Sequence, residues 1–202
     1  MAKKLLEPST LLPCMVVIVT CMGNDGKPNM STISEGGVLS NEPPILGISV
    51  NKAHASYKQI KETMEFVINI PPETLLWETD VVGCISGRKK DKFELMKGRL
   101  TPIPSQVVKV PSLKECPVNI ECKVKSIIGL GSEDLFIAEV VANVADEEVL
   151  RPGAFTEDHI AFNKPALDIG KIRPLLNIHG GGHYWNIKDE LEPLFYSYKK
   201  KK

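Results

Sequence analysis

The chain has 202 residues, which suits a single domain, because a globule of this size buries roughly 70% of the surface that its unfolded chain exposes. Its 25 basic and 25 acidic residues cancel, and this balance argues against a nucleic-acid-binding surface or attraction to an anionic membrane. The lysines at 199–202 form a local basic tail, which we interpret as a solvated terminus.

The cysteines and the apolar segments of the sequence indicate the cellular compartment in which the protein is expected. Cysteines occur at positions 14, 21, 84, 116 and 122, an odd number with no Cys-x-x-Cys pair, which predicts reduced thiols and no zinc site. The N-terminus lacks an apolar run of signal-peptide length, and no segment approaches the roughly 20 apolar residues that a membrane helix needs. We therefore expect one cytoplasmic domain that spans residues 1–202.

The first part of the chain predicts a hairpin. Cys14–Cys21 is a continuous apolar run rich in β-branched residues, which is typical of a strand buried on both faces. Asn24–Pro28 contains Asp-Gly turn chemistry, so we expect Asn29–Ile33 to return as the second strand. A glycine-punctuated loop should follow, until the prolines at 43 and 44 exclude a helix and begin a strand over Ile45–Val50.

The hydrophobic period changes after Ala53. Tyr57, Ile60 and Met64 recur at helical spacing with charged residues between them, which predicts an amphipathic helix. Glu65–Ile70 alternates as a strand, and the prolines at 71 and 72 end it and open a second helix that runs to about residue 82.

The second half of the chain favours a barrel. Residues 118–125 alternate apolar and polar side chains, and Gly129–Ser132 turns the chain into a second apolar run over Leu135–Val144. Two long antiparallel strands after several shorter ones favour a closed or partly closed barrel over a doubly wound sheet. After Ala145, repeated prolines indicate an irregular extension that packs on the barrel.

Polar residues around the second and third predicted strands suggest an anion site. Ser31, Thr32 and Ser34 lie on one strand, Lys52 closes the next, and a helix begins near Ala53. A helix N-terminus offers free N–H groups and the positive end of a dipole, so these groups can converge on one phosphate. The alternative is a hydroxyl-bearing edge strand followed by a solvated lysine.

The polar segment between Gly83 and Gly98 is predicted as a loop with a short helix around Lys92–Met96. Ser86-Gly87-Arg88 and Asp91-Lys92-Phe93 mix a hydroxyl, cations and an aromatic ring. Loops of this kind carry function more often than core strands do, although a solvated surface loop fits the same residues.

The order of these motifs is more specific than any one of them. Asn-x-Ser-x-x-Ser from Asn29 precedes Ser-x-x-Pro-Pro at 40–44, Asn51-Lys52 and Ser56-Tyr57. Later motifs are Phe66-Val67-Ile68-Asn69, Ser86-Gly87-Arg88, Asp91-Lys92-Phe93, Pro174-Leu175-Leu176 and His183-Tyr184-Trp185. Over nearly the whole chain this order resembles the flavin reductase-like family of FMN-binding split barrels, particularly its flavoredoxin-type members.

The resemblance implies a mostly β fold, a six-stranded antiparallel split β-barrel with peripheral helices and an irregular C-terminal extension. It also implies a homodimer with FMN bound at the subunit interface. The residues that match the family's FMN-binding positions are Asn29, Ser31, Thr32, Ile33, Ser34, Ser49, Val50, Asn51, Lys52, Ser56, Tyr57, Cys84, Ser86, Gly87, Lys92 and Phe93. Lys52 is expected to pair with the FMN phosphate.

The function that the resemblance implies is an oxidoreductase that passes electrons through FMN from a reduced donor to a small-molecule, ferric or protein acceptor. Members that use NAD(P)H efficiently often carry a histidine where this chain has Glu133-Asp134. Both NAD(P)H and a protein therefore stay open as electron donors. A non-catalytic FMN carrier or storage protein is the alternative, whereas few aromatics and zero net charge argue against a barrel that binds single-stranded nucleic acid.

Other candidates carry less chemistry. The sequence contains no nucleophile elbow and no carboxylate pair with hydrolase spacing. His54 and His159 are interpreted as structural, and Gly180–Gly182 as a tight turn rather than a phosphate-binding loop. His179, His183, Tyr184 and Trp185 suit either a pocket wall or a core or subunit interface. Cys84 is the thiol expected nearest the ligand.

Overall fold

The computed structural model describes residues 3, 5, 12–151, 165–178 and 182–188. Its main element is a seven-stranded antiparallel sheet with the strand order β3-β2-β6-β9-β10-β5-β4. The strands are β2 (Val17–Met22), β3 (Pro28–Ile33), β4 (Gly36–Asn41), β5 (Pro44–Asn51), β6 (Glu65–Ile70), β9 (Val118–Gly129) and β10 (Glu133–Ala145). The expected mostly β, antiparallel split-barrel fold class is confirmed, although the main sheet has seven strands rather than the expected six, because β4 is added at its edge.

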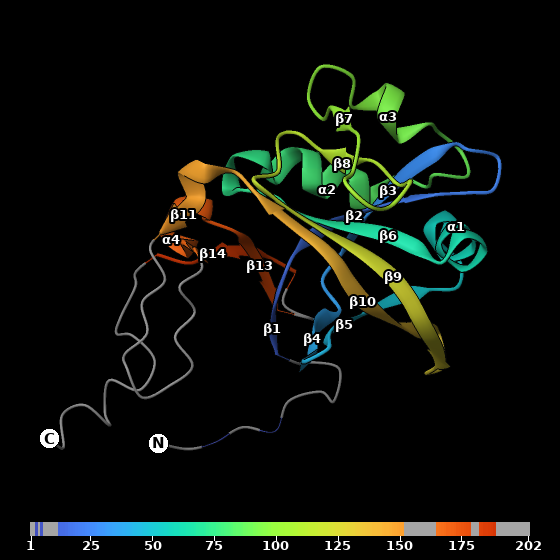
Figure 1. Ribbon diagram of the computed structural model, residues 1–202, viewed down its shortest axis with the longest axis horizontal. Coiled ribbons are helices and arrows are strands. Elements are labelled where there is room, and N and C mark those ends of the chain that lie inside the picture. Colours follow the sequence, from blue (N-terminus) through green and yellow to red (C-terminus); the bar gives the residue numbers. More distant parts are fainter. Residues whose placement is uncertain (1–2, 4, 6–11, 152–164, 179–181, 189–202) are drawn as a thin grey trace, which may run out of the picture.

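Smaller elements surround this sheet. β1 (Pro13–Met15), β13 (Leu175–Ile178) and β14 (Tyr184–Asn186) form a three-stranded sheet, and two-stranded pairs join β7 (Pro102–Ile103) to β8 (Ser112–Leu113) and β11 (Leu150–Arg151) to β12 (Ala166–Leu167). The helices are α1 (Ala55–Thr63), α2 (Leu76–Cys84), α3 (Lys92–Leu95) and α4 (Ile169–Ile172), with 3-10 turns at Glu73–Leu75 and Glu147–Val149. In Figure 1, α3 and the β7–β8 pair lie together beside α2. β14 of the three-stranded sheet contacts α2, because the Tyr184 hydroxyl donates to Asp80.

Two strand predictions need correction. Gly36–Asn41, expected as a loop, forms β4, because it pairs with β5 from Gly36 opposite Ile48 to Asn41 opposite Pro44. The run Cys14–Cys21 is not one strand, because the backbone N–H of Val16 donates to the carbonyl of Leu175 at 2.8 Å. The chain therefore leaves the small sheet at this point and enters the main sheet as β2.

The core explains why β2 has a continuous apolar sequence. Val17, Val19 and Cys21 face one buried cluster with Phe66 and Phe136. Ile18 faces a second cluster, which α2 and α3 cover with side chains such as Val82 and Met96. Both faces of β2 are thus buried, as the sequence predicts.

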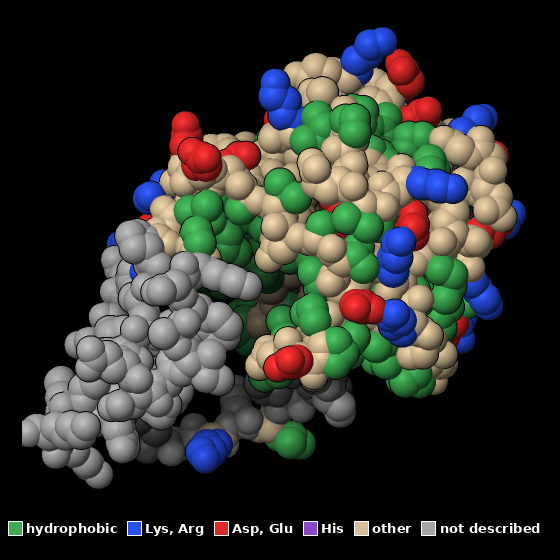
Figure 2. Space-filling view, in the orientation of Figure 1, with side chains coloured by type: hydrophobic (Ala, Val, Ile, Leu, Met, Phe, Trp, Pro, Cys, Tyr) green, Lys and Arg blue, Asp and Glu red, His purple; other side chains and the backbone are tan. Residues whose placement is uncertain are grey.

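The outer surface carries charges of both signs. In Figure 2, Lys and Arg side chains alternate with Asp and Glu side chains over the visible face, consistent with the zero formal net charge of the chain. No helix in the described part of the chain is both long and apolar enough to cross a membrane.

Helix α1 ends where the sequence pattern predicts. Met64 adopts the left-handed conformation at φ 58°, and its N–H donates to the carbonyl of Ile60. Ile60 is fully buried under the helix, and the ring of Tyr57 packs edge-on against Phe136 with centroids 5.7 Å apart. These contacts fix the N-terminus of α1 against the sheet.

A buried carboxylate holds the segment before β8. Glu121 on β9 is 0% exposed, and its oxygens accept hydrogen bonds from the backbone N–H groups of Gln106 at 2.6 Å, Val107 at 2.7 Å and Val108 at 3.0 Å. Three N–H groups that have no strand partner are therefore satisfied by one side chain.

We expect Glu121→Ala to lower the free energy of unfolding by about 3–5 kcal/mol, because three backbone donors lose their acceptor. Urea denaturation of the purified variant measures this. Glu148→Ala removes an exposed carboxylate and should change the free energy by no more than about 0.5 kcal/mol. Equal stability of the two variants would contradict the assigned role of Glu121.

Candidate functional site

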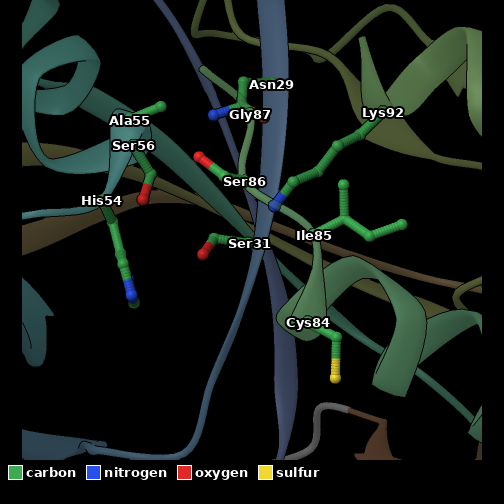
Figure 3. A pocket seen from close by; sticks show the side chains of 11 residues that line it. Asn29, Ser31, His54, Ala55, Ser56, Cys84, Ile85, Ser86, Gly87 and Lys92 are labelled. Carbon is green, nitrogen blue, oxygen red and sulfur yellow. The ribbon is translucent and has the colours of Figure 1, made fainter. Parts of the chain in front are cut away.

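A cavity of about 130 Å³ lies where β3, the N-terminus of α1 and the segment that joins α2 to α3 meet. Figure 3 shows the side chains from these elements around it. The lining residues are Asn29, Ser31, His54, Ala55, Ser56, Gly83, Cys84, Ile85, Ser86, Gly87 and Lys92. We call it the small cavity.

The N-terminus of α1 supplies hydrogen-bond donors to the small cavity. His54 is the N-cap residue in an extended conformation, and its side chain makes no capping hydrogen bond. The first-turn N–H groups therefore keep their donor capacity and the positive end of the helix dipole. Ser56 is 1% exposed, and its Oγ has no hydrogen-bond partner among the described residues. A ligand in this cavity can satisfy that hydroxyl.

Lys92 places a buried cation in the same cavity. Asp91 caps α3 by accepting from the N–H groups of Phe93 and Glu94, and the Lys92 side chain, 5% exposed, crosses to β3 and α2. Its Nζ donates to the carbonyl of Met30 at 2.8 Å and to that of Val82 at 2.7 Å. An ammonium group has three donors, so one N–H is left for the cavity, toward which Figure 3 shows the side chain pointing.

Burial controls the charge of Lys92. Desolvation lowers the pKa of its ammonium group to about 8, with a smaller opposing effect from the Cys21 thiol. An anion in the small cavity would raise this pKa again, because it favours the protonated form.

Close backbone approach shapes the wall of the small cavity that contains Gly87. A Cβ at Gly87 would lie 2.6 Å from Oδ1 of Asn29, and the Asn29 Nδ2 is itself held by Gln59 Oε1 at 2.8 Å. Only glycine fits at position 87 without moving Asn29. Thr32 Oγ1 donates to the carbonyl of Thr79 and anchors β3 to α2 on the same side.

A second cavity, of about 720 Å³, adjoins the first, because His54 lines both. We call it the large cavity. The residues that line it are Leu12, Cys14, Thr32, Ile33, Ser34, Glu35, Ser49, Val50, Asn51, His54, Leu130, Ser132 and Glu133. It is therefore built from the ends of β3 and β5 and from the turn between β9 and β10.

Glu133 is fixed at this cavity by uncharged donors. Asn51 Nδ2 donates to Glu133 Oε1 at 2.8 Å, and the Ser132 hydroxyl donates to Oε2. These hydrogen bonds, first that from Ser132 and then that from Asn51, lower the pKa of the Glu133 carboxyl group. The side chain is therefore a carboxylate at neutral pH.

Lys52 points to a different carboxylate. Its Nζ lies 3.0 Å from Oδ1 of Asp134 and donates to the carbonyl of Gly131 at 2.8 Å. The hydroxyl of Tyr57 donates to Asp134 Oδ2 at 2.7 Å. The hydrogen bonds from Tyr57 and then Lys52 lower the pKa of Asp134. Lys52, Tyr57 and Asp134 thus form one network beside the large cavity.

Most of the site residues expected from the sequence line one of the two cavities. The small cavity brings together Asn29, Ser31, Ser56, Cys84, Ser86, Gly87 and Lys92. The large cavity brings together Thr32, Ile33, Ser34, Ser49, Val50 and Asn51. Lys52, Tyr57 and Phe93 line neither cavity. Lys52 and Tyr57 are directed to Asp134, and Phe93 packs against the apolar cluster under α2 and α3.

Sequence reasoning missed several lining residues. His54 was interpreted as structural, yet it lies at the junction of the cavities, and its place just before a predicted helix was the available signal. The other missed residues are Leu12, Cys14, Glu35, Ala55, Gly83, Ile85, Leu130, Ser132 and Glu133. No sequence pattern could have identified Leu130 and Ser132, because the sequence of a turn between two strands does not show which cavity the turn lines.

The late aromatic residues lie elsewhere in the described structure. The Tyr184 hydroxyl donates to Asp80 Oδ1 at 3.1 Å, and burial raises the pKa of Tyr184 to about 12. Trp185 is 56% exposed, and neither residue lines the two cavities. The predictions for His159, for His179 and for much of the turn at 180–182 lie outside the described residues.

The sheet and the two adjoining cavities define a mostly β protein of the split-barrel class with a two-part candidate site. Within that class, the chain belongs to the family described as flavin reductase like domain, which matches residues 9–181. The resemblance seen in the sequence is thereby confirmed. No group of three or more metal-binding side chains occurs among the residues that the structure describes.

Individual relatives support the same class. Flavoredoxin of Desulfovibrio vulgaris superposes with a TM-score of 0.84 and 27% identity over 98% of this chain and 100% of that chain. An uncharacterized protein of Archaeoglobus fulgidus is 37% identical over 115 residues, 57% of this chain and 64% of that protein, so the match spans less than two thirds of that relative. Flavin reductase (NADH) of Kitasatospora aureofaciens is 27% identical over 143 residues, 70% of this chain and 71% of that protein. These matches support a flavin cofactor and a flavin-related oxidoreductase role.

Proposed function

We propose that the protein is an FMN-dependent oxidoreductase whose small cavity holds the FMN phosphate and whose large cavity receives the isoalloxazine ring. The observation that carries the proposal is the set of buried donors in the small cavity. The Ser56 hydroxyl, the third N–H of Lys92 and the N-terminus of α1 converge there. A phosphate offers several acceptor oxygens and a double negative charge, which fits this donor set.

Each group has a separate part in binding. Lys92 supplies the charge, while Ser56 and the first turn of α1 supply neutral donors. Gly87 leaves room for the Ser86–Gly87 backbone to approach Asn29 closely. This arrangement favours FMN over riboflavin, because riboflavin has no phosphate to satisfy the buried donors.

The large cavity suits a planar ring. Ile33, Val50 and Leu130 provide apolar area, and Ser34, Ser49 and Asn51 provide polar groups at its edge. When bound there, FMN supplies electron transfer through its isoalloxazine ring. The chain orients the ring and leaves space for a donor or an acceptor beside it. NAD(P)H and a protein donor are both compatible with this proposal.

A non-catalytic FMN carrier is the second candidate, because the small cavity alone explains FMN binding.

Purified protein loaded with FMN should be yellow, and the proposed oxidoreductase should lose its absorbance near 450 nm when a donor is added without oxygen. Readmitted oxygen or a ferric acceptor should restore the colour, and repeated cycles should consume donor continuously. NADH, NADPH and a low-potential chemical donor are compared. FMN that binds but is never reduced by any of them would support the carrier instead.

The phosphate assignment predicts different roles for two lysines. Lys92→Met should weaken FMN binding by roughly ten- to a hundredfold, because a hydrogen bond to a charged group contributes on the order of 1.5–3 kcal/mol. Lys52→Ala should change FMN affinity by less than about twofold, because Lys52 is already paired with Asp134. Fluorescence titration at one fixed salt concentration gives the dissociation constants.

Riboflavin is the internal control for both variants, since its affinity should respond to loss of fold but not to loss of a phosphate contact. Ser86→Ala is a milder test of the same cavity if Lys92→Met folds poorly.

The pH dependence of FMN binding to the wild-type protein tests the phosphate assignment without any substitution. FMN affinity should fall as pH rises above about 8, where Lys92 of the free protein loses its proton, whereas riboflavin affinity should stay constant. If Lys52→Ala alone strongly weakened FMN binding, the phosphate-binding lysine would be Lys52 and not Lys92.

We also propose a homodimer, because an apolar surface surrounds an exposed sheet edge. Val38 and Leu39 on edge strand β4 are 75% and 54% exposed. An apolar cavity of about 110 Å³ beside them is lined by residues that include Met15, Ile33 and Ile68. Exposed edge strands of this kind are normally covered, and a second copy of the chain would cover both features.

Sedimentation should report about twice the chain mass of 22.3 kDa. Val38→Asp should shift this mass toward the monomer, because it places a charge in the proposed interface. Leu76→Asp is a matched control at a 41% exposed leucine on α2 and should leave the mass unchanged. A wild-type monomer with tightly bound FMN would overturn the dimer and leave the phosphate assignment standing.

A further inference from the structure

The two cavities have opposite electrostatic character. Of the described residues that line the large cavity, Glu35 and Glu133 are carboxylates, and none is Lys or Arg. The small cavity contains Lys92 and no carboxylate among its described lining residues. We propose that the large cavity selects electron donors and acceptors by charge, and that it admits cationic or uncharged small molecules and disfavours anionic ones. This inference rests on the proposed FMN function.

Glu133 carries most of the argument, because its charge and its position are both fixed. Its two oxygens are held by Asn51 and Ser132, which are neutral donors. The lowered pKa keeps it ionised through the neutral range. Hydrogen bonds from uncharged groups leave the full negative charge in place, in contrast to an ion pair.

Lys52 does not cancel this charge. Lys52 lies 3.0 Å from Asp134 and is held there together with the carbonyl of Gly131. The pair is close to neutral as a unit, so Glu133 remains the uncompensated charge at this end of the network. Glu35, Cys14 and His54 also line the cavity, and the interaction of His54 with Glu133 makes only a small contribution to stabilising the carboxylate.

Glu35 contributes a second carboxylate to the lining of the large cavity. It follows β3, and its carboxylate accepts from the Ser34 hydroxyl at 3.0 Å and from the Ser34 N–H at 3.3 Å. A cleft lined by charges of one sign concentrates ions of the other sign and repels ions of the same sign. Nicotinamide dinucleotides are anionic, so the large cavity disfavours them in comparison with a neutral or cationic donor.

The kinetic test compares two reduced viologens of closely matched potential. The radical of methyl viologen is a cation, and the radical of the bis-sulfonatopropyl viologen has a net negative charge. Each radical gives one electron and returns to its oxidised form, so two radicals and protons from solvent convert bound FMN to the hydroquinone. At low ionic strength the cation should react at least about fivefold faster, and the ratio should approach one at high salt.

A second readout is independent of turnover. Collisional quenching of the fluorescence of bound FMN is measured with anionic iodide and with neutral acrylamide, with iodide replacing chloride at constant ionic strength. Glu133→Gln and Glu35→Gln should each increase the iodide quenching constant by about two- to threefold and leave acrylamide quenching unchanged. Glu139→Gln removes the same charge from β10 but lines neither cavity, so it should affect neither quencher.

Charge selection is overturned if the viologen ratio is independent of salt, or if iodide quenching in the two cavity variants equals that of the wild type. The FMN affinity measured on the same samples separates the two proposals. Normal affinity with no charge effect rejects charge selection alone. Absence of FMN binding rejects the proposed function on which it rests.

Discussion

The candidate site depends on the hydrogen bonds that the buried ammonium group of Lys92 donates. This group links α3 to β3 through the carbonyl of Met30 and to α2 through that of Val82. Burying an ammonium group is costly, and the lowered pKa of Lys92 reflects that cost. Two carbonyls offset part of the cost and leave one donor pointing into the cavity. The same group therefore joins three elements and defines the chemistry of the space between them.

The two cavities follow from the way the strands end. β3 and β5 bring hydroxyl-bearing residues to the large cavity, while α1 begins beside them and turns its first N–H groups toward the small one. His54 lies where the two meet, immediately before α1. One end is cationic and the other acidic, so a ligand with an anionic end and a neutral planar end has one favourable orientation. This polarity follows from side-chain positions rather than from net charge, which is zero.

The strands with clear burial patterns were predictable from the sequence, and those without such patterns were not. Residues 118–125 alternate apolar and polar side chains, although the polar residues Asn119 and Glu121 are buried as well. β4, in contrast, is almost entirely exposed and shows no such pattern. The break at Val16 was equally hidden, because an apolar run does not show which sheet each part joins. The different roles of Lys52 and Lys92 were also hidden in the sequence. Each lies beside a helix start, but only tertiary contacts direct one to Asp134 and the other into the cavity.

The Lys52–Asp134–Tyr57 network has a consequence for the large cavity. Asp134 forms an ion pair with Lys52 and accepts a hydrogen bond from the Tyr57 hydroxyl. These contacts and the pairing of β10 with β5 fix the start of β10 against β5 and α1. Glu133, the preceding residue, then accepts side-chain hydrogen bonds from the neutral donors Asn51 and Ser132. Neighbouring residues on a strand point to opposite faces, so Asp134 is neutralised beside the large cavity while Glu133 keeps its charge in the cavity lining. Removing Lys52 would thus disturb the position of Glu133 at the large cavity before it disturbed the small cavity.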